Sequence, residues 1–331
     1  MSRSRRFVQH SVMTTIHRFI WIVLLLTLAA GQASAVVCGD DVGGRDVPCS
    51  CGDTVGSSVV LVDDPVTITR CRRNGLIVGV GRDATGIEID LNGRTLRGRG
   101  EGAGLWVMSG GRDGVRIVSN GAPAVIEGFR DGIAARTKGT VSTIDNVILS
   151  GSQRDGVHVF SDAVQIRDCE AYNSGRDGFW VRGNAWVLKD LRAFNSRRHG
   201  INASGESGTV GVRRAGVTAE SSGSVGINVG GVGHRIIECV AIGGRADGVK
   251  TSGAFHEVSG CLAVDNDGTG IQGAASISRV QNNRAEHNGR DGILFPGHDM
   301  QDAGGNIGLE NGKQHNGPAT KECEIGGVPC R

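Results

Sequence analysis

Residues 154–160 read RDGVHVF, and residues 176–182, 22 positions later, read RDGFWVR. The shared phrase is a glycine followed by a β-branched or aromatic residue, and it returns from residue 132 to residue 295. Its glycines are Gly132, Gly156, Gly178, Gly200, Gly226, Gly248, Gly270 and Gly292, separated by 24, 22, 22, 26, 22, 22 and 22 residues. A period of this size predicts stacked repeats, each of which buries its apolar face only against its neighbours.

Alignment of the repeats on this glycine produces apolar columns. Seven residues before the glycine stands Leu149 or an alanine, and nine before it stands Val, Leu, Cys or, once, Asn283. Twelve before it stands Ile, Leu or Val, except in the 26-residue step, where Arg214 falls in the column. Within each cluster the apolar spacing is two, which is the period of a half-buried strand. Each repeat therefore carries at least two short strands, and equivalent residues stack on the next coil.

Three other kinds of solenoid are excluded by composition or by the period of the repeat. Leucine-rich repeats need several leucines per unit, and helical repeats need a 3.6-residue pattern that is missing here. A left-handed β-helix is built on hexapeptides, and 22 is not a multiple of six. The remaining fold is all-β: a single right-handed parallel β-helix with coils of about 22 residues, stacked about 4.8 Å apart.

The first 35 residues are typical of a secretory signal peptide. Four arginines precede an apolar run at 19–30, and Ala33-Ser34-Ala35 follows it. We expect a secreted protein, extracellular or periplasmic, with no membrane span after signal removal; an uncleaved anchor is the alternative. Removing 1–35 takes away four arginines and no acid, which leaves 32 basic and 34 acidic residues and a formal charge of −2. This balance argues against nucleic acid as a partner.

All nine cysteines lie beyond residue 35, in the exported part. In an oxidising compartment we expect disulfides that pin irregular caps at both ends of the solenoid. The expected pairs are Cys38–Cys49, Cys51–Cys71 and Cys323–Cys330. Cys169, Cys239 and Cys261 fall in the inward column nine before the glycine, so we expect them to remain reduced and to pack as small apolar groups. Zinc binding is the alternative, but no C-x-x-C pair supports it.

These features divide the chain into four parts. Residues 1–35 are the predicted signal peptide, and residues 36–75 are a disulfide-bonded N-terminal cap with the first strands. Residues 76–300 form the β-helix, and residues 301–331 form a C-terminal cap. A solenoid needs such caps because its core and strand edges would otherwise be exposed at both ends.

Several segments resemble those of a known group of proteins. They are CGDTV (51–55), GLIVGVGRDATGIEIDLNGRTLRGRG (75–100), AVIEGFRDGIA (124–134), GGNIGLENG (304–312) and CEIGGVPC (323–330). The chain is similar in these segments to secreted bacterial right-handed β-helix repeat proteins of the pectin-lyase-like superfamily. The resemblance implies the fold and no reaction, because the WxDH and RxPxxR motifs of pectate lyases and the NTDG of polygalacturonases are missing.

One face of the predicted β-helix combines aromatic and polar side chains. On the strand that opens at the glycine, positions two and four point outward. Three neighbouring repeats therefore expose His158, Phe160, Trp180, Arg182, Asn202 and Ser204, with Asp177 and His199 at the edge. An outward Trp beside Arg, His and Asn predicts a surface that binds an acidic polysaccharide along the solenoid axis. The alternative is a decorated solvent face with loops lying over Trp180.

Candidate roles follow from the chemistry of uronates. Trp180, Arg182, Asn202 and Lys250 are candidate substrate-binding residues. A lyase or epimerase needs a base for the C5 proton, so His158 and His199 are candidate catalytic residues, with Lys250 as another candidate base. A glycosidase needs two carboxylates, and neither outward row contains an acid.

The repeated Arg-Asp-Gly places Asp131, Asp155, Asp177, Asp247 and Asp291 in one column. Stacked acids repel, and stacked arginines can pair with them, so we expect a ladder of ion pairs and no metal or other cofactor. Calcium (Ca2+) between Asp155 and Asp177 is the alternative.

Two function classes remain open. The first is an exported protein that binds an acidic polysaccharide and acts on it in the manner of a lyase or epimerase. The second is a non-catalytic surface or scaffold β-helix with a glycan-binding or adhesive role.

Overall fold

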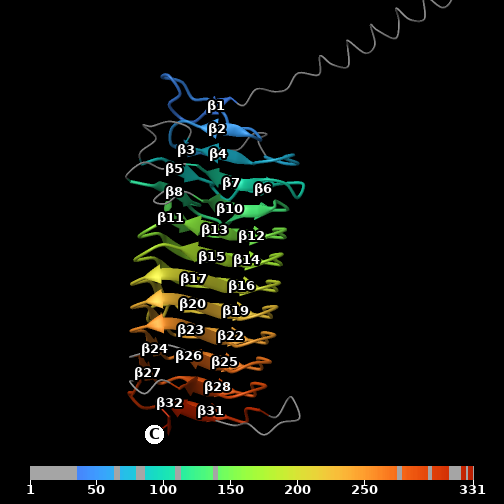
Figure 1. Cartoon of the computed structure of the whole chain (residues 1–331). Coiled ribbons are helices and arrows are strands. Elements are labelled where there is room, and N and C mark those ends of the chain that lie inside the picture. Colours follow the sequence, from blue (N-terminus) through green and yellow to red (C-terminus); the bar gives the residue numbers. More distant parts are fainter. Residues whose placement is uncertain are drawn as a thin grey trace, which may run out of the picture. The chain divides into compact units, whose positions relative to one another are not determined.

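The computed structural model describes residues 36–62, 68–79, 86–108, 113–136, 141–273, 278–296, 300–312, 322–325 and 327–330. Residues 36–331 form one compact unit, and every regular element in its described part is a strand (Figure 1). The predicted signal peptide lies outside the described residues. Within those residues, no helix has the length and apolar character needed to cross a membrane.

Sheet A receives one strand from each coil, and its strands pair in parallel except for the last two. The strands in order are β1 (Val37–Cys38), β2 (Asp53–Val55), β4 (Leu76–Val78), β7 (Ala103–Val107), β10 (Asp131–Ala135), β13 (Val157–Phe160), β15 (Phe179–Arg182), β17 (Ile201–Glu206), β20 (Ile227–Val232), β23 (Val249–Ala254), β26 (Ile271–Gly273), β29 (Ile293–Phe295), β32 (Cys323–Ile325) and β33 (Val328–Pro329). The sheet therefore runs from the predicted N-terminal cap through the β-helix into the predicted C-terminal cap. Strand pairing continues across both predicted boundaries, after residue 75 and after residue 300.

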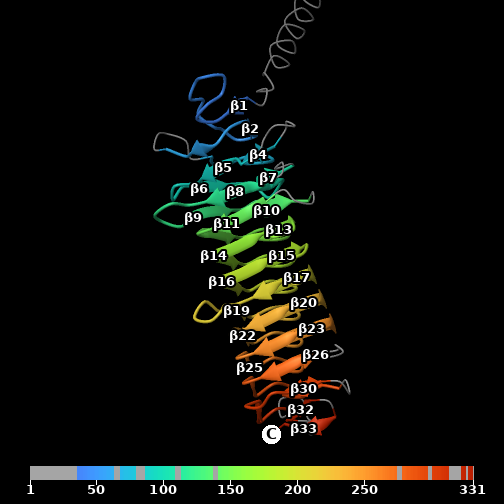
Figure 2. The same cartoon turned by 90° about the vertical axis from the view of Figure 1, so that its left-hand side faces the viewer.

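Sheet B has two limbs, and in each of them strands of successive coils stack on one another (Figure 2). The first limb contains β3 (Val59–Val60), β5 (Glu88–Asp90), β8 (Val115–Val118), β11 (Val141–Asp145), β18 (Thr209–Val210), β21 (Arg235–Ile237), β24 (Glu257–Ser259), β27 (Arg279–Gln281) and β30 (Gln301–Asp302). The second limb contains β6 (Thr95–Arg97), β9 (Ala124–Glu127), β12 (Val147–Ser150), β19 (Val217–Glu220), β22 (Cys239–Ile242), β25 (Leu262–Val264), β28 (Arg284–Glu286) and β31 (Ile307–Leu309). Two longer strands, β14 (Gln165–Tyr172) and β16 (Val187–Phe194), run through both limbs.

A single residue in the left-handed region makes the bend between the limbs. Asn146, Asp168 and Asp190 occupy this corner in successive coils, with φ values of 59°, 51° and 49°. Asn and Asp tolerate this conformation better than other residues with a side chain. The corner thus explains why short polar residues recur between two apolar positions of the repeat.

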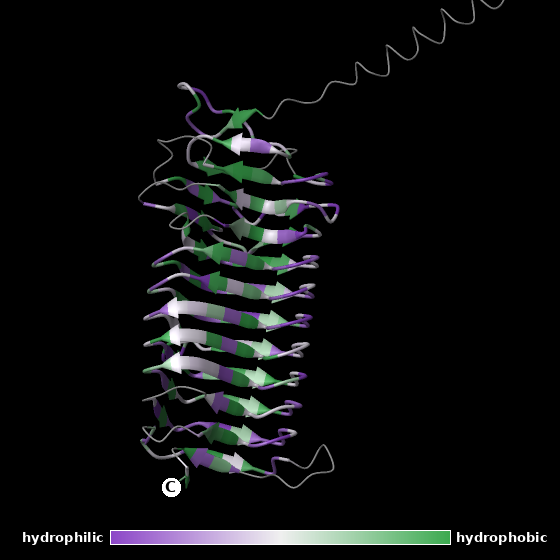
Figure 3. Cartoon of the chain, in the orientation of Figure 1, coloured by the Kyte–Doolittle hydropathy of each residue, from purple (hydrophilic) through white to green (hydrophobic). Residues whose placement is uncertain are grey.

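The inward columns form the core as predicted. The alanines seven before the repeat glycine are all at most 1% exposed, and they stack through β14, β16, β19, β22, β25 and β28. In Figure 3, apolar and polar segments recur at similar places along successive coils, as expected for stacked columns. The repeat glycine belongs to the same packing: a Cβ on Gly178 would lie 2.6 Å from the carbonyl oxygen of Gly200 and 2.9 Å from Cβ of Ala193.

The placement of Arg214 in the inward column is wrong. The 26-residue step carries extra residues at 211–216, between β18 and β19, where Val212 and Ala215 form an antiparallel bridge. Val210 therefore takes the column position between Leu188 and Ile236, and Arg214 is exposed. An insertion at a corner leaves the stacking of the strands unchanged, because the loop leaves and rejoins the coil at the same place.

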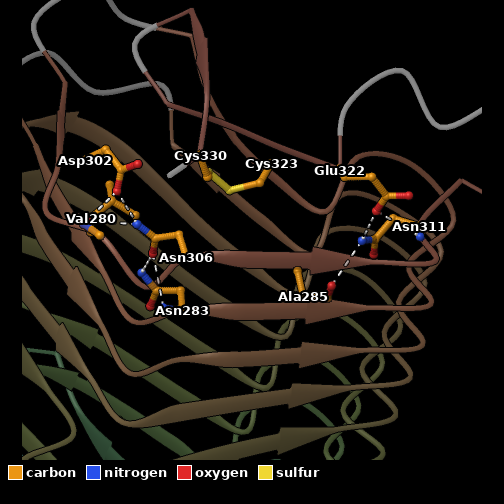
Figure 4. Close-up of a disulfide and its surroundings, with 10 residues drawn as sticks. Val280, Asn283, Ala285, Asp302, Asn306, Asn311, Glu322, Cys323 and Cys330 are labelled. Carbon is orange, nitrogen blue, oxygen red and sulfur yellow. Dashed lines mark hydrogen bonds between the residues drawn. A yellow bond between two sulfur atoms is a disulfide. The ribbon is translucent and has the colours of Figure 1, made fainter.

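Asparagine ladders lie beside the apolar core near the C-terminal end (Figure 4). The buried Asn288 donates from Nδ2 to Oδ1 of Asn311 at 2.9 Å, and its own Oδ1 accepts from Nδ2 of Asn266 at 2.9 Å. Asn311 in turn donates to Glu322. A second ladder runs from Asn283 through Asn306 to Asp302. A primary amide both donates and accepts, so identical residues in adjacent coils satisfy each other without water.

Four disulfides are present, and three of them confirm the predicted pairs Cys38–Cys49, Cys51–Cys71 and Cys323–Cys330. The expectation that Cys239 and Cys261 remain reduced is wrong, because they form the fourth disulfide inside the solenoid. The two residues occupy the same column in adjacent coils, with Cα atoms 4.5 Å apart, which is within the disulfide range of about 4.4–6.8 Å. Cys169 stays a free buried thiol as predicted, and burial raises its pKa to about 12.

The disulfide pattern predicts one reactive thiol in the denatured, unreduced protein. A maleimide should leave the native protein unlabelled, since Cys169 is buried and protonated, and should add one label after denaturation without reduction. Intact mass spectrometry measures the number of labels. The variant Cys169→Ser should take up none, and three labels on the wild type would contradict the bridge between Cys239 and Cys261.

Two histidines stack inside the corner between sheet A and sheet B. His234 and His256 are both buried, with ring centroids 5.3 Å apart, and Trp186 stacks on His234 at 5.0 Å. The backbone N–H of Gly208 donates to Nδ1 of His234 at 2.9 Å. Each Nε2 lies within hydrogen-bond distance of a backbone carbonyl oxygen, which assigns the proton to Nε2. Burial disfavours the charged imidazolium, so it lowers the pKa of both histidines and keeps their rings neutral.

This stack predicts that stability falls as the pH is lowered. The pKa values of His234 and His256 in the folded protein are below the ordinary value of 6.5, so the unfolded chain binds more protons. Their contribution is complete above about pH 6.5 and is lost as the pH falls below it. Urea unfolding between about pH 7.5 and about pH 5 should show this loss. In the double variant His234→Gln/His256→Gln the pH dependence should be weaker, and an unchanged dependence would contradict the assignment.

Candidate functional site

The outward row of sheet A has the register predicted from the repeat. Residues two positions after the glycine pair directly from coil to coil. The row contains Ala134, His158, Trp180, Asn202, Asn228, Lys250 and Gln272. Arg182 lies in the next outward row, opposite Phe160 and Ser204, and His199 precedes the strand of its coil. The structure thus brings His158, Trp180, Arg182, His199 and Asn202 to one side, with Lys250 three coils beyond Trp180.

Trp106 extends this row toward the N-terminus and was missed in the sequence. It pairs with Ile77 on one side and with Ala134 on the other, and it is 37% exposed. A signal is present in the sequence, since Gly104-Leu105-Trp106 has a glycine followed by an apolar residue, with Trp at the outward position. The 28-residue step to Gly132 hides it from a search for a period of 22.

His158 does not face solvent, although it stands in the outward row. Its ring is 4.1 Å from the Trp180 ring and 5.0 Å from the Phe160 ring, and the residue is only 4% exposed. The guanidinium of Arg176 lies 4.5 Å from the centre of the Trp180 ring. A large outward side chain on a sheet leans over its smaller neighbour, and here the indole covers the imidazole. His158 therefore has no open path to an external polymer in this arrangement.

The Arg-Asp-Gly column is a ladder of ion pairs between coils. Arg154 donates from Nε and Nη2 to the two carboxylate oxygens of Asp131 in the preceding coil, at 2.9 Å each. Arg176 lies 3.2 Å from Asp155, and Arg198 donates to both oxygens of Asp177. The three carboxylates are fully buried, whereas the arginines keep part of their surface exposed.

The same carboxylates also accept backbone hydrogen bonds. The N–H of Asp177 donates to Asp155 at 3.2 Å, and the N–H of His199 donates to Asp177 at 3.1 Å. The pairing with Asp177 raises the pKa of Arg198. Each aspartate therefore joins its own coil to the next through both a charge and a main-chain contact. This geometry favours the ion-pair ladder over calcium at Asp155 and Asp177, because arginines already supply the positive charge.

Asp131, Asp155 and His158 are close enough for one metal ion, with possible ligand atoms within 4.8 Å of one another. Arg154 lies among the same groups, since its Nη2 is 2.9 Å from Asp131 and 3.1 Å from Nδ1 of His158. Its Nε is also 3.3 Å from Asp155. A guanidinium is thus already in contact with all three candidate ligands, and we assign no metal to them.

The polar part of the row is linked by hydrogen bonds. Asn202 donates to Asp177 at 3.2 Å, and Asn228 donates to Oδ1 of Asn202 at 3.0 Å. Lys250 pairs with Asp247 at 3.1 Å and keeps 40% of its side chain exposed. These contacts hold the side chains in fixed positions, one per coil, while each stays half-accessible to solvent.

His199 is the more accessible of the two candidate histidines. It is half-buried, and burial lowers its pKa against the opposing effect of the neighbouring Asp177 carboxylate. It is therefore neutral near pH 7, which is the form that can accept a proton.

Positive charge exceeds negative charge on this face. In the four coils that begin at Gly132, Gly156, Gly178 and Gly200, the rows beside and along the sheet A strands carry six arginines and four acids, which are three aspartates and the exposed Glu206 at the end of β17. The arginines are Arg130, Arg136, Arg154, Arg176, Arg182 and Arg198. Because the aspartates are fully buried beneath them, the accessible charge of this surface is positive.

Comparisons with known proteins support the fold. The sequence model of a family described as "right handed beta helix region" matches residues 131–213, about a quarter of the chain. No curated protein sequence matches the chain. Among solved structures, the A-module of the mannuronan C-5 epimerase AlgE4 from Azotobacter vinelandii is similar, with a TM-score of 0.42 and 14% identity over 79% of this chain and 77% of that one. A likeness at this level of identity says nothing about what this chain binds.

The prediction of an all-β, right-handed parallel β-helix with coils of about 22 residues is confirmed. The parallel register of sheets A and B establishes the coil, and the matching family gives the hand.

The ion-pair ladder predicts a specific loss of stability in Asp177→Asn. The variant keeps the size of the side chain but leaves Arg198 without its counter-charge and weakens the acceptor for two N–H donors. Since Arg198 is partly exposed, we expect a loss of about 1–3 kcal/mol in the free energy of unfolding. Chemical denaturation measures it. The control Glu206→Gln, an exposed acid at the end of β17, should change it by less than about 0.5 kcal/mol. Equal effects of the two variants would contradict the ladder.

Proposed function

We propose that the chain is an exported protein that binds an extended acidic polysaccharide along the outward face of sheet A. The observation that carries the proposal is the excess of arginine over aspartate on this face, next to two indole rings in one row. Carbohydrate recognition combines aromatic faces with hydrogen-bonding and charged groups, and carboxylates on the polymer would complement the accessible arginines. The buried aspartates do not repel such a ligand, because each is paired with an arginine.

The regular rise of the coils suits a repeating ligand. Successive outward residues lie about 4.8 Å apart, a distance close to the length of one sugar unit in an extended chain. Trp180, Asn202 and Lys250 would then meet successive parts of one polymer, with Arg182 pairing with a carboxylate. Trp106 is the more open of the two indoles, since Trp180 already contacts His158 and Arg176.

The geometry supports binding better than catalysis. His158 is covered by Trp180, and the aspartates of this face are buried and ion-paired. His199 is neutral near pH 7 and half-accessible, and this observation favours one second candidate: a lyase- or epimerase-like reaction with His199 as the base. Such activity would give unsaturated or epimerised uronates, and its loss in His199→Gln with binding retained would support it.

Export is part of the same proposal. Four disulfides are typical of proteins from oxidising compartments, and an acidic polysaccharide of a cell surface or its surroundings would be met there. A non-catalytic scaffold with a glycan-binding or adhesive role fits the same face and the same location.

Affinity electrophoresis of the purified protein in gels containing acidic or neutral polysaccharides tests the proposal. Wild type should be retarded by at least one acidic polymer and not by its neutral counterpart, and less so at high salt. Arg182→Glu and Trp106→Ala should each weaken binding by about tenfold, since each removes a charge contact or a stacking contact of about 1.4 kcal/mol. The matched control is Arg235→Glu, which reverses an exposed charge on sheet B.

Trp180→Ala is expected to lower the melting temperature as well as the affinity, because Trp180 covers His158. The two exposed variants therefore decide the question. Retardation that is unchanged in Arg182→Glu and Trp106→Ala, or equally reduced in Arg235→Glu, would contradict binding on sheet A.

A further inference from the structure

The second limb of sheet B presents a surface that the proposed glycan site does not use. In the six coils from β14 to β28, every second residue of this limb points outward, and these residues form two rows that run parallel to the solenoid axis. The first row contains Glu170, Arg192, Thr218, Val240, Leu262 and Arg284. The second row contains Tyr172, Phe194, Glu220, Ile242, Val264 and Glu286. All twelve are half-buried or exposed.

The centre of this surface is apolar. Val240, Ile242, Leu262 and Val264 come from two adjacent coils and form a square of outward aliphatic side chains. Outward aliphatic residues in both rows of two successive coils gain free energy when they are covered, at roughly 25 cal/mol for each Å² removed from water. Contiguous patches of this kind mark surfaces where proteins associate.

The two rows differ in shape. Four residues of the first row, Glu170, Arg192, Thr218 and Val240, line a hollow of about 550 Å³ at the bend between the limbs, which Asp168, Asp190 and Glu238 also line. The second row carries a ridge, because Tyr172 and Phe194 stack in parallel with ring centroids 5.1 Å apart. A hollow and a ridge therefore lie side by side on the same face, and in a two-fold dimer the ridge of each copy would lie against the hollow of the other.

The charges of the two rows are also complementary. When two copies face each other about a two-fold axis parallel to the solenoid axis, each first-row residue meets the second-row residue of the same coil in the other copy. Arg284 then meets Glu286, Leu262 meets Val264, and Val240 meets Ile242. In the coils nearer the N-terminus, Glu170 meets the hydroxyl of Tyr172, and Arg192 meets the ring of Phe194, which is a favourable cation–π pair. No like charges are opposed. An antiparallel arrangement centred on the apolar square would instead oppose Glu220 to Glu286.

We propose that this surface binds a second copy of the chain, with the two solenoids parallel and side by side about this axis. A two-fold interface uses the same patch on both copies, so a patch must be complementary to itself, as these two rows are. The residues Arg284 and Glu286 already pair within one chain, and the dimer makes the same pair twice between chains.

The size of the surface determines how strong the dimer is. Six coils span about 29 Å, and two outward rows with their side chains are about 12 Å wide, which gives roughly 350 Å² per copy before the corner residues are added. This is below the size of standard specific interfaces and in the range of weak, transient ones, so the dimer dissociates in the micromolar to submillimolar range. Sheet A is not part of the surface, and glycan binding therefore does not depend on the dimer.

Sedimentation equilibrium of the purified protein over about 5 µM to about 500 µM tests the proposal by the mass of the particle. Wild type should shift from monomer to dimer across this range. Arg284→Glu should weaken association by at least tenfold. In the dimer of this variant, the glutamate at position 284 of each copy would face Glu286 of the other copy, so that like charges repel at both contacts. The double variant Arg284→Glu/Glu286→Arg exchanges the two charges and should recover association to within about threefold of wild type.

Arg235→Glu is the matched control, since it reverses a partly exposed, ion-paired arginine on the first limb, outside the surface. It should associate like wild type, and all variants should keep the wild-type circular dichroism. A monomer at every concentration, no weakening in Arg284→Glu, or a double variant as weak as the single one would each overturn the proposal. A mass above that of the dimer, or association that is lost equally in Arg235→Glu, would overturn it as well.

Discussion

The structure depends on one constraint: hydrogen bonds between parallel strands place each residue directly over its equivalent in the next coil. Every position of the repeat thereby becomes a column, and each residue must be compatible with its own kind about 4.8 Å away. Aliphatic side chains and alanine meet this condition in the core. Asparagine also meets it, because its amide donates to one neighbour and accepts from the other, as Asn266, Asn288 and Asn311 do. Aspartate does not, and the column that begins at Asp131 is stable only because arginines of the following coils lie between the acids.

The same constraint explains how much of the fold could be predicted from the sequence. A column can be read without coordinates, since the repeat glycine fixes its register, and the buried alanines and the outward row were both found in this way. Register no longer identifies the columns where the period changes. Arg214 was misplaced because it lies within the four-residue insertion between β18 and β19, and Trp106 was missed because its repeat lies 28 residues before the next. Neither the insertion nor the longer step disturbs the stacking of the coils, so the repeats on either side keep their regular spacing and give no sign of it.

Errors of a second kind come from chemistry between neighbours in a column. Cys239 and Cys261 were expected to behave as small apolar groups, which is what their burial alone suggests. Their spacing of one coil gives a Cα separation of 4.5 Å, and two thiols at that distance in an oxidising compartment form a bond. Cys169 has Val147 and Leu191 as its column neighbours and remains free for that reason. The sequence contained this information, because the column neighbours of each cysteine were known.

The candidate site shows where periodicity stops being informative. The repeat places His158 and Trp180 in the outward row, and the structure agrees. It does not say which of two adjacent outward side chains covers the other, since that depends on side-chain size and rotamer rather than on register. Here the indole covers the imidazole, so that a residue chosen as a catalytic base is 4% exposed, while His199, just before its strand, stays accessible.

A surface built from columns also restricts the kind of partner that can use it. A single small ligand meets one or two coils and ignores the rest, whereas a ligand with its own repeat gains a contact at every coil. Sheet A combines stacked amides, indoles and arginines at one residue per coil, which is the arrangement that a polymer of similar repeat can follow. The second limb of sheet B combines two columns that are complementary to each other, and the partner that carries both columns at the same spacing is another copy of the chain. The two proposed partners thus differ for one physical reason: each would have to match the coil rise, and only its chemistry changes with the residues in the rows.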